Sequence, residues 1–423
     1  MRRFSALADT LGDEGLRLFF PLAALHAAIW PALWAIGQGF DLVFTRTTSP
    51  FVWHGYELLI GAYGAALIGF ITTAVPEWTG TPRPQGGLLF GLALLWGIGR
   101  LVGLGGADRF GVVAALADLG WLAALVGFVA LVSLRRRTDR LLGFLLWLSA
   151  LAAAAAMVRW GMICADMALA ERGVLMVALA FLGLLGLALA RIGPPILNQI
   201  LDPTEASFPF RPHPGRLNLA PGLVAVAVIG QGVGGAEPVF AYLLMAAGAA
   251  FLDRTGETFV GREFFRAEVL ALAGSSLLAG AGLMAWGASL LWATTTPLFG
   301  LHLAVMGGLG LGVLAVFSIA GLLHTGRPLG LRRKTRFALL LILLALGVRV
   351  LPEFGLGGLN AYRWAALLWA ASFLLWFWDY WPWLKSAPGG PDHASACGGV
   401  SFSRSTARAA ICPTRASTDI GRK

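Results

Sequence analysis

Long apolar runs recur along almost the whole chain and constrain its fold more than any other feature. About 20 predominantly apolar residues are needed for a helix to cross the hydrocarbon core of a bilayer. We predict twelve such spans, at residues 18–37, 53–75, 86–106, 110–134, 141–163, 173–192, 218–235, 237–252, 267–292, 297–323, 336–352 and 362–384. Lipid offers no partners for backbone polar groups, so the pattern predicts an all-α, polytopic membrane helix bundle of about 12 transmembrane helices. The seventh and eighth spans are short, and either tilted short helices or one broken hairpin fits them.

Composition supports a lipid environment. The chain is 57% hydrophobic and 13% charged, whereas soluble domains carry about 25% charged residues. Its net charge of +10 comes mostly from arginines in short loops and in the C-terminal tail. No basic amphipathic face follows from them, so the predicted partner is the bilayer and not a nucleic acid. The run 18–37 is too long for a signal-peptide core and lacks a convincing cleavage site, so we expect it to be retained.

The basic residues also predict an orientation. With a cytoplasmic N-terminus, the outer segments hold only Arg46, Arg109, Arg172 and Arg363. The inner segments hold Arg2, Arg3, Arg17, Arg83, Arg135, Arg136, Arg137, Arg140, Arg211, Arg216, Arg254, Arg262, Arg266, Arg327, Arg332, Arg333, Lys334 and Arg336. This asymmetry is the positive-inside pattern, and an even number of spans then places both termini in the cytoplasm.

The composition changes after Lys385. Residues 386–423 are rich in Ser, Ala, Gly and Arg and show no sustained periodicity. Such a segment cannot bury enough apolar area to offset the entropy of ordering. We therefore expect one transmembrane domain over residues 1–385 and a disordered tail over 386–423.

Two histidines occupy similar depths at the predicted outer side. His54 and Glu57 begin the second span, three residues apart and so on one helix face. His302 begins the tenth span, with Met306 one turn deeper. One hypothesis is that His54 and His302 ligate a shared metal or haem iron, with Glu57 as a supporting partner or further ligand. The alternative is a set of interfacial or bundle side chains whose hydrogen bonds are structural.

A second polar group is predicted at the cytoplasmic side. His324 ends the tenth span, 22 residues after His302, a rise of about 33 Å that prevents the two from ligating one ion. Pro76, Pro194 and Pro195 are expected to break helices at the same side. The pairing of Glu77 with Arg191 is plausible there. Within the spans, the charged residues Arg100, Asp118, Arg159 and Arg349 are expected to face the bundle interior or an interface.

Four short motifs together resemble one known family. TAVPEWTG, preceded by Thr72, resembles the TAVPNWTG segment of the NnrS family, and WHGYE resembles the family's WHAHE segment. HTGRPL matches the family's segment near its third-last helix, and RIGPP resembles the family's RIIP segment. They occur in the same order over residues about 20–384. The chain departs from the family pattern at Tyr56 and Ala271, where the family has histidines, and at Gly274, where it has tyrosine. The family's Asn and His of the fifth span are also not evident here.

The resemblance implies a bacterial inner-membrane protein linked to nitric oxide metabolism and protection from nitrosative stress. NnrS proteins are described as containing haem and copper. Carried over to this chain, the cofactor-binding residues would be His54, Glu57 and His302, and the metal-binding residues His54, His302 and His324. Nitric oxide would then be a small ligand. No catalytic constellation is visible in the sequence, so enzymatic activity is not predicted.

Two other functions compete with this hypothesis. A metal-free transporter or channel-like protein would be indicated by internal repeats and by helices broken in mid-membrane. A membrane assembly or structural protein would use ridges of Gly and Ala to contact partner helices. Metal analysis of the purified protein separates the first hypothesis from both alternatives. The sequence does not specify an oligomeric state.

Overall fold

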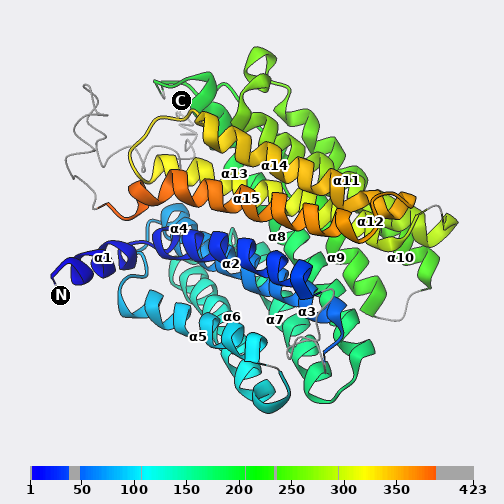
Figure 1. Cartoon of the computed structure of the whole chain (residues 1–423). Coiled ribbons are helices and arrows are strands. Elements are labelled where there is room, and N and C mark those ends of the chain that lie inside the picture. The colour runs from blue at the N-terminus through cyan, green and yellow to red at the C-terminus, as the bar shows by residue number, and fades with distance from the viewer. Residues whose placement is uncertain are drawn as a thin grey trace, which may run out of the picture.

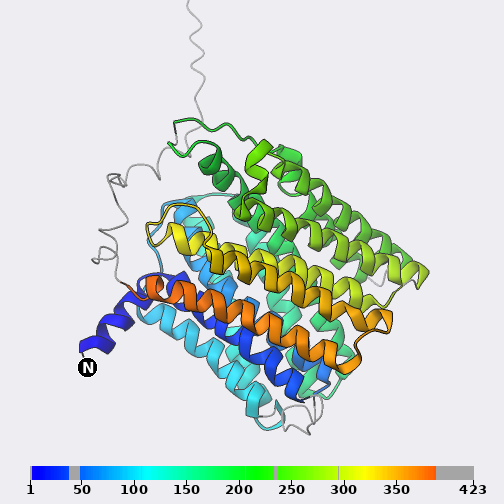
Figure 2. The same cartoon turned by 45° about the horizontal axis from the view of Figure 1, so that its top comes forward.

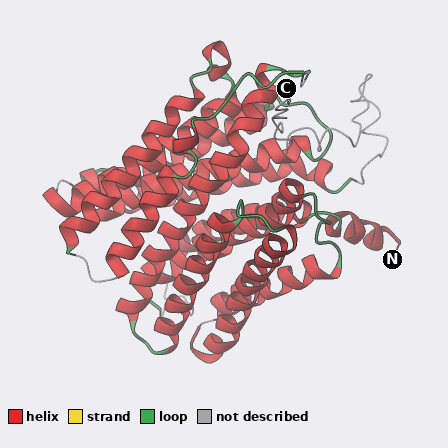
Figure 3. Cartoon of the chain, turned by 180° about the vertical axis from the view of Figure 1, so that it is seen from behind, coloured by secondary structure: helices red, strands yellow, loops and turns green. Residues whose placement is uncertain are grey.

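The architecture comes from a computed structural model that describes residues 2–37, 48–105, 107–204, 206–232, 236–293 and 295–386. All regular elements in these ranges are helices, and none is a strand (Figure 3). The prediction of an all-α, polytopic bundle is therefore confirmed. Residue 46 and nearly all of the predicted disordered tail lie outside the described residues.

Fifteen α-helices make up the described part of the bundle, joined by short π- and 3₁₀-segments. Their bounds are α1 Arg2–Gly12, α2 Gly15–Gly37, α3 Pro50–Tyr56, α4 Gly64–Thr79, α5 Gly87–Gly105, α6 Ala107–Arg136, α7 Leu142–Ile163, α8 Met167–Leu201, α9 Leu219–Gly232, α10 Glu237–Thr255, α11 Ala267–Trp292, α12 Pro297–His302, α13 Gly310–Leu323, α14 Arg333–Val350 and α15 Gly358–Leu384.

Nine helical segments of the described chain are long and apolar enough to cross a membrane, which identifies a multi-pass membrane protein. The predicted count of about 12 is not confirmed. Each predicted span does coincide with a helix, but α9 has only 14 residues, fewer than a crossing needs. Helices α10 and α15 are long enough but fall short in apolarity. In α15 the many tryptophans lower the mean hydropathy, since their rings suit interfaces as well as cores.

The helices pack side by side in one bundle, with α1 projecting from one end (Figure 1). Helices α2 and α15, from the two ends of the described chain, lie against each other along their length (Figures 1 and 2). The second span and α8 are the most enclosed, with 89% and 83% of their apolar windows buried. These two segments therefore form the centre of the bundle, to which the candidate site belongs.

Two spans share an unusual internal pattern. Each begins with a proline at its first turn, carries a histidine within six residues, and then continues as a seven-residue π-helix before returning to α-helix. The π-helical segments are η2, Glu57–Tyr63, which precedes α4, and η6, Leu303–Leu309, which precedes α13. Local π-helix is rare and frequently marks functional sites. Both spans stay continuous through it, without the mid-membrane break that a transporter of the broken-helix type would show.

The prolines at the predicted cytoplasmic side do not end their helices, which corrects the sequence expectation. Pro76 lies inside α4, and Pro194 and Pro195 lie inside α8, which continues to Leu201. A proline removes only its own backbone donor and displaces one carbonyl, which a well-packed helix tolerates. Helix α4 ends instead at Gly80, whose left-handed φ of 61° closes the last turn.

Candidate functional site

His54 and His302 line one cavity of about 390 Å³ between α3, α12 and α15. This volume falls within the range of about 300–1,000 Å³ typical of small-molecule and cofactor sites. The wall is mainly apolar, with Phe51, Leu58 and Trp369 among its members. Met306, one turn below His302, is also a lining residue. We call this space the histidine cavity.

The two histidines reach the cavity from corresponding places in the two spans that contain π-helix. His54 lies on α3, three residues before η2, and His302 ends α12 directly before η6. The Nδ1 of His302 is 2.7 Å from the Leu298 carbonyl oxygen. If Nδ1 carries the proton, it donates to that carbonyl and leaves Nε2 with a free lone pair. That tautomer is the one in which an imidazole can ligate a metal through Nε2.

Among the described residues that line the histidine cavity, one side chain is charged. Arg349, near the end of α14, lies with its guanidinium 4.6 Å from the ring centre of Tyr362, another lining residue. Its nearest carboxylate contact, to Glu353, is long at 4.0 Å. Arg349 is close enough to act electrostatically on both His54 and His302. The cavity thus combines two imidazoles, an apolar wall and one positive charge.

Glu57 is not among the described residues that line this cavity. Its Oε2 lies 3.5 Å from His26 Nε2 and 3.4 Å from Arg100 Nε. His26 also contacts the Glu57 carbonyl oxygen at 3.0 Å and stacks on Trp30. The α-helix gives way to π-helix at Glu57, which changes the winding there and turns this carboxylate toward α2 and α5. A role for Glu57 in cofactor binding stays a prediction without support from this contact.

Asp118, fully buried on α6, is the centre of a neighbouring charge network. Its carboxylate accepts a hydrogen bond from Arg100 at 2.8 Å, one from Arg159 at 3.0 Å and one from the Tyr56 hydroxyl at 3.0 Å. The Arg159 guanidinium also lies 4.6 Å from the Tyr56 ring centre. Two arginines are balanced by Asp118 and Glu57, so buried charge is compensated inside the bundle. Tyr56, at the position where the resemblance led us to expect a histidine, is held in this network.

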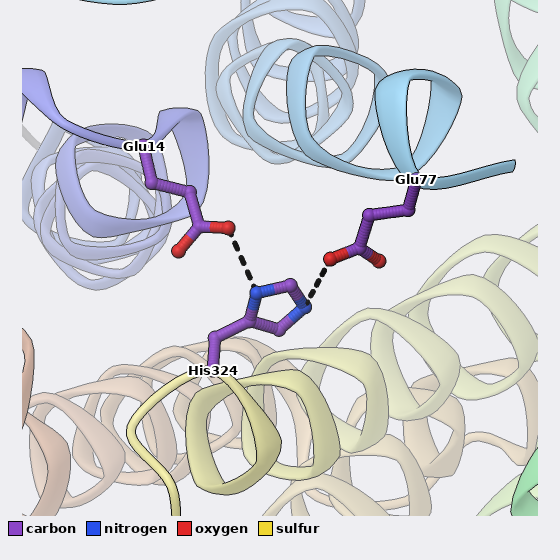
Figure 4. A group of neighbouring side chains, drawn as sticks. All are labelled: Glu14, Glu77 and His324. Carbon is purple, nitrogen blue, oxygen red and sulfur yellow. Dashed lines mark hydrogen bonds and ion pairs between the residues drawn. The ribbon is translucent and has the colours of Figure 1, made fainter. Parts of the chain in front are cut away.

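A second candidate site lies at the opposite end of the same helices. Glu14 precedes α2, Glu77 lies near the end of α4, and His324 caps α13 (Figure 4). One ligand atom from each lies within 4.8 Å of the others, a spacing that could hold a metal ion. His324 Nδ1 is 2.8 Å from Glu14 Oε1, and its Nε2 is 3.7 Å from Glu77 Oε1. We call these three residues the Glu–Glu–His cluster.

Arg83 already occupies the carboxylates of this cluster. Its guanidinium lies 2.6 Å from Glu14 and 2.9 Å from Glu77. Burial opposes ionisation of Glu14, but the His324 hydrogen bond and the charges of His324, Arg83 and Arg17 outweigh it and lower the Glu14 pKa. Burial likewise disfavours the charged form of His324, yet its hydrogen bond to Glu14 and the charges of Glu14 and Glu77 raise the His324 pKa. A metal ion would therefore have to displace both Arg83 and a proton.

The predicted pair of Glu77 and Arg191 is wrong. Glu77 is paired with Arg83, while Arg191 donates to the Arg140 carbonyl and lies over the Trp78 ring. Arg83 follows Glu77 by six residues across the turn at Gly80, so this local partner, which the sequence does show, takes the place of the distant Arg191. Glu14 was not predicted from the sequence as a member of the inner cluster. The only available signal was an acidic residue directly before a long apolar run.

A comparison with models of known protein families gives a match over most of the chain. The family model described as NnrS protein matches residues 10–387, nearly nine-tenths of the chain. No curated protein matches the sequence. The matched range covers both the histidine cavity and the Glu–Glu–His cluster.

Proposed function

Because the chain belongs to the NnrS family, we propose that it is a membrane protein of the nitric oxide response that holds haem in the histidine cavity. The observation that carries the proposal is the presence of His54 and His302, from spans about 250 residues apart in sequence, on the wall of one cavity. The bacterial inner membrane with cytoplasmic termini remains our expectation for its location.

The residues of the cavity fit a haem in three respects. Imidazole nitrogens are common axial ligands of haem iron, and Met306 adds a thioether of the kind that also ligates haem. The apolar wall suits a porphyrin face, and the small residues Gly55, Ala365 and Ala366 leave room beside it.

The chain's own groups would orient and shield the ligand. The His302 hydrogen bond to the Leu298 carbonyl fixes one ring orientation. The apolar wall excludes water, and Arg349 supplies a positive charge for an anionic group of the bound molecule. If haem were bound there, its iron would supply the affinity for nitric oxide, and the polarity of the surrounding side chains would tune that affinity.

Spectroscopy of the purified protein tests this proposal. We expect a Soret band in the wild-type protein that shifts or weakens in His54→Ala and in His302→Ala and that responds to added nitric oxide. His213→Ala, in an exposed loop outside the cavity, is the matched control and should leave the spectrum unchanged. Wild-type protein without a Soret band after reconstitution with haemin would refute haem binding. An identical spectrum in both cavity variants would refute ligation by these two histidines.

Copper, the second metal that the resemblance implies, has a different candidate position. The Glu–Glu–His cluster supports it through the 4.8 Å spacing of its ligand atoms, although two carboxylates also suit harder cations. Since Arg83 occupies the same oxygens, Arg83→Ala should tighten binding of Cu²⁺ or Zn²⁺, and Glu14→Gln should abolish it. Metal content after equilibrium dialysis measures both effects. Equal, substoichiometric metal in wild type and Arg83→Ala would remove the cluster as a metal site.

A further inference from the structure

A second, smaller cavity of about 70 Å³ lies between α4, α8 and α13 and is partly open to the outside of the bundle. Aromatic side chains make much of its wall, including Phe70, Phe144, Phe181 and Phe317. Aliphatic side chains from the same helices complete the wall. The second span and α8, which contribute most of these residues, are the most enclosed segments of the bundle. We call this space the central cavity.

Tyr63 belongs to the walls of both cavities. It is the last residue of η2, and its hydroxyl donates a 2.8 Å hydrogen bond to the carbonyl of Val305 in η6. Val305 itself lines the histidine cavity. The two π-helical segments are therefore tied together by Tyr63 at the boundary between the two spaces. Its ring also packs edge-on against Phe181, a wall residue of the central cavity.

The chemistry of the central cavity disfavours water. A buried water needs two to four polar partners. The Tyr63 hydroxyl is the one polar side-chain group among the lining residues, and its proton is already used by Val305. The volume is nevertheless several times the roughly 10–15 Å³ that one water molecule requires, and an engineered apolar cavity of about 150 Å³ is known to stay dry and to take up xenon.

We propose that the central cavity binds small, neutral, apolar molecules of the size of a diatomic gas or a xenon atom, and that Tyr63 is the partition between it and the histidine cavity. Such molecules concentrate in hydrocarbon, and the lining of the cavity offers them dispersion contacts without a competing water. If the histidine cavity holds haem as proposed above, the central cavity is a reservoir next to the haem ligands. That last step rests on the proposed function, whereas gas binding does not.

Xenon is the probe that tests the binding step. We expect anomalous density for xenon in the central cavity of pressurised wild-type crystals, or the corresponding exchange signal in ¹²⁹Xe NMR of the detergent-solubilised protein. Val316→Phe, which fills the cavity from α13, should lose the signal at least tenfold. Val226→Phe, on the exposed surface of α9, is the matched control and should retain it. Leu184→Ala enlarges the cavity and should raise xenon occupancy, which keeps the test valid if Val316→Phe fails to fold.

The partition is tested by removing the Tyr63 ring. Tyr63→Ala should join the two spaces, so that xenon also occupies the position of the ring, whereas Tyr63→Phe should keep two separate sites. Xenon absent from the wild-type cavity at saturating pressure, or ordered water or an acyl chain found there, would overturn the proposal. Because xenon is measured without haem, a missing Soret band together with xenon binding would refute only the proposed function. A Soret band without xenon binding would refute only the inference made here.

Discussion

His324 Nδ1 lies 2.8 Å from a carboxylate oxygen of Glu14, so the end of α13 is joined to the beginning of α2 by a charge-assisted hydrogen bond. Glu14 is 3% exposed in its side chain and His324 15%. Arg83 and Glu77 complete the same group from the end of α4 and the turn that follows it. Because four segments meet here, the protonation states of Glu14 and His324 affect the stability of this end of the bundle.

Stability should therefore depend on pH through this pair. The Glu14 pKa is lowered from 4.5, so its contribution is complete above pH 4.5 and is lost as the pH falls through the folded-state value. The His324 pKa is raised from 6.5, so its contribution is complete below pH 6.5 and is lost as the pH rises through the folded-state value. We expect the apparent unfolding midpoint in detergent to be highest between these limits.

Variants show which residue causes the loss of stability at acid pH and which causes it at alkaline pH. His324→Gln should flatten the alkaline limb and cost about 1.5–3 kcal/mol near pH 6, as expected for a hydrogen bond between charged groups. Glu14→Gln should flatten both limbs. His213→Gln, in an exposed loop, is the control and should reproduce the wild-type profile. An alkaline limb unchanged by His324→Gln would show that another group titrates there.

Asp118→Asn should be among the most destabilising single substitutions in the bundle. It would leave Arg100 and Arg159 buried with one carboxylate fewer, and breaking a buried ion pair from one side typically costs about 3–5 kcal/mol. Thermal unfolding followed by intrinsic fluorescence measures the loss. The double variant Asp118→Asn with Arg159→Gln should recover part of it, because the uncompensated charge is removed. Asp139→Asn, on an exposed loop, should change stability by less than about 0.5 kcal/mol.

The sequence predicted helices well because each helix in lipid must satisfy its own backbone. Helix α11, Ala267–Trp292, and the span from Pro297 to Leu323 have the bounds expected from the apolar pattern. The continuity of α8 through Pro194 and Pro195 was not predictable, since it depends on packing around a displaced carbonyl. The π-helical segments were not predictable either. A π-helix has about one more residue per turn than an α-helix, and the apolar pattern of a short segment does not distinguish the two.

For the candidate sites, the sequence predicted how deep a residue lies in the membrane, but not the direction in which its side chain points. His54 and His302 were expected at one level because both begin spans that enter from the predicted outer side, and they line one cavity. The direction of Glu57 depends on the change of winding at its own position. The Glu14 contact to His324 joins residues 310 positions apart, and no local pattern encodes such a contact.

Gly282→Ala and Gly300→Ala should each disrupt the packing of α11 against α12. A Cβ at Gly282 would collide with the Ala304 backbone nitrogen, and one at Gly300 with the Trp286 backbone nitrogen. Neither backbone can move without shifting a helix, so we expect a loss of about 1–3 kcal/mol or more from each. Gly222→Ala on α9, where a Cβ meets nothing within 4 Å, should instead be neutral or stabilise by up to roughly 1 kcal/mol. Unfolding midpoints that rank the three variants otherwise would contradict this packing.

Arg349→Gln should weaken the binding of haem with free carboxylates, but not the binding of haem whose carboxylates are esterified. In the described part of the chain, Arg349 is the one charged group lining the histidine cavity, and the carboxylate paired with it there, Glu353, is 4.0 Å away. A haem propionate could therefore pair with it, and loss of a charged hydrogen bond of about 1.5–3 kcal/mol corresponds to a drop in affinity of roughly 10–100-fold.

Titration of the haem-free protein with haemin and with haemin dimethyl ester, followed at the Soret band, measures the effect. The wild type should prefer haemin, and Arg349→Gln should bind both alike. Arg363→Gln, an exposed residue on α15 that does not line the cavity, should behave as the wild type, and an unchanged haemin preference in Arg349→Gln would exclude the propionate contact.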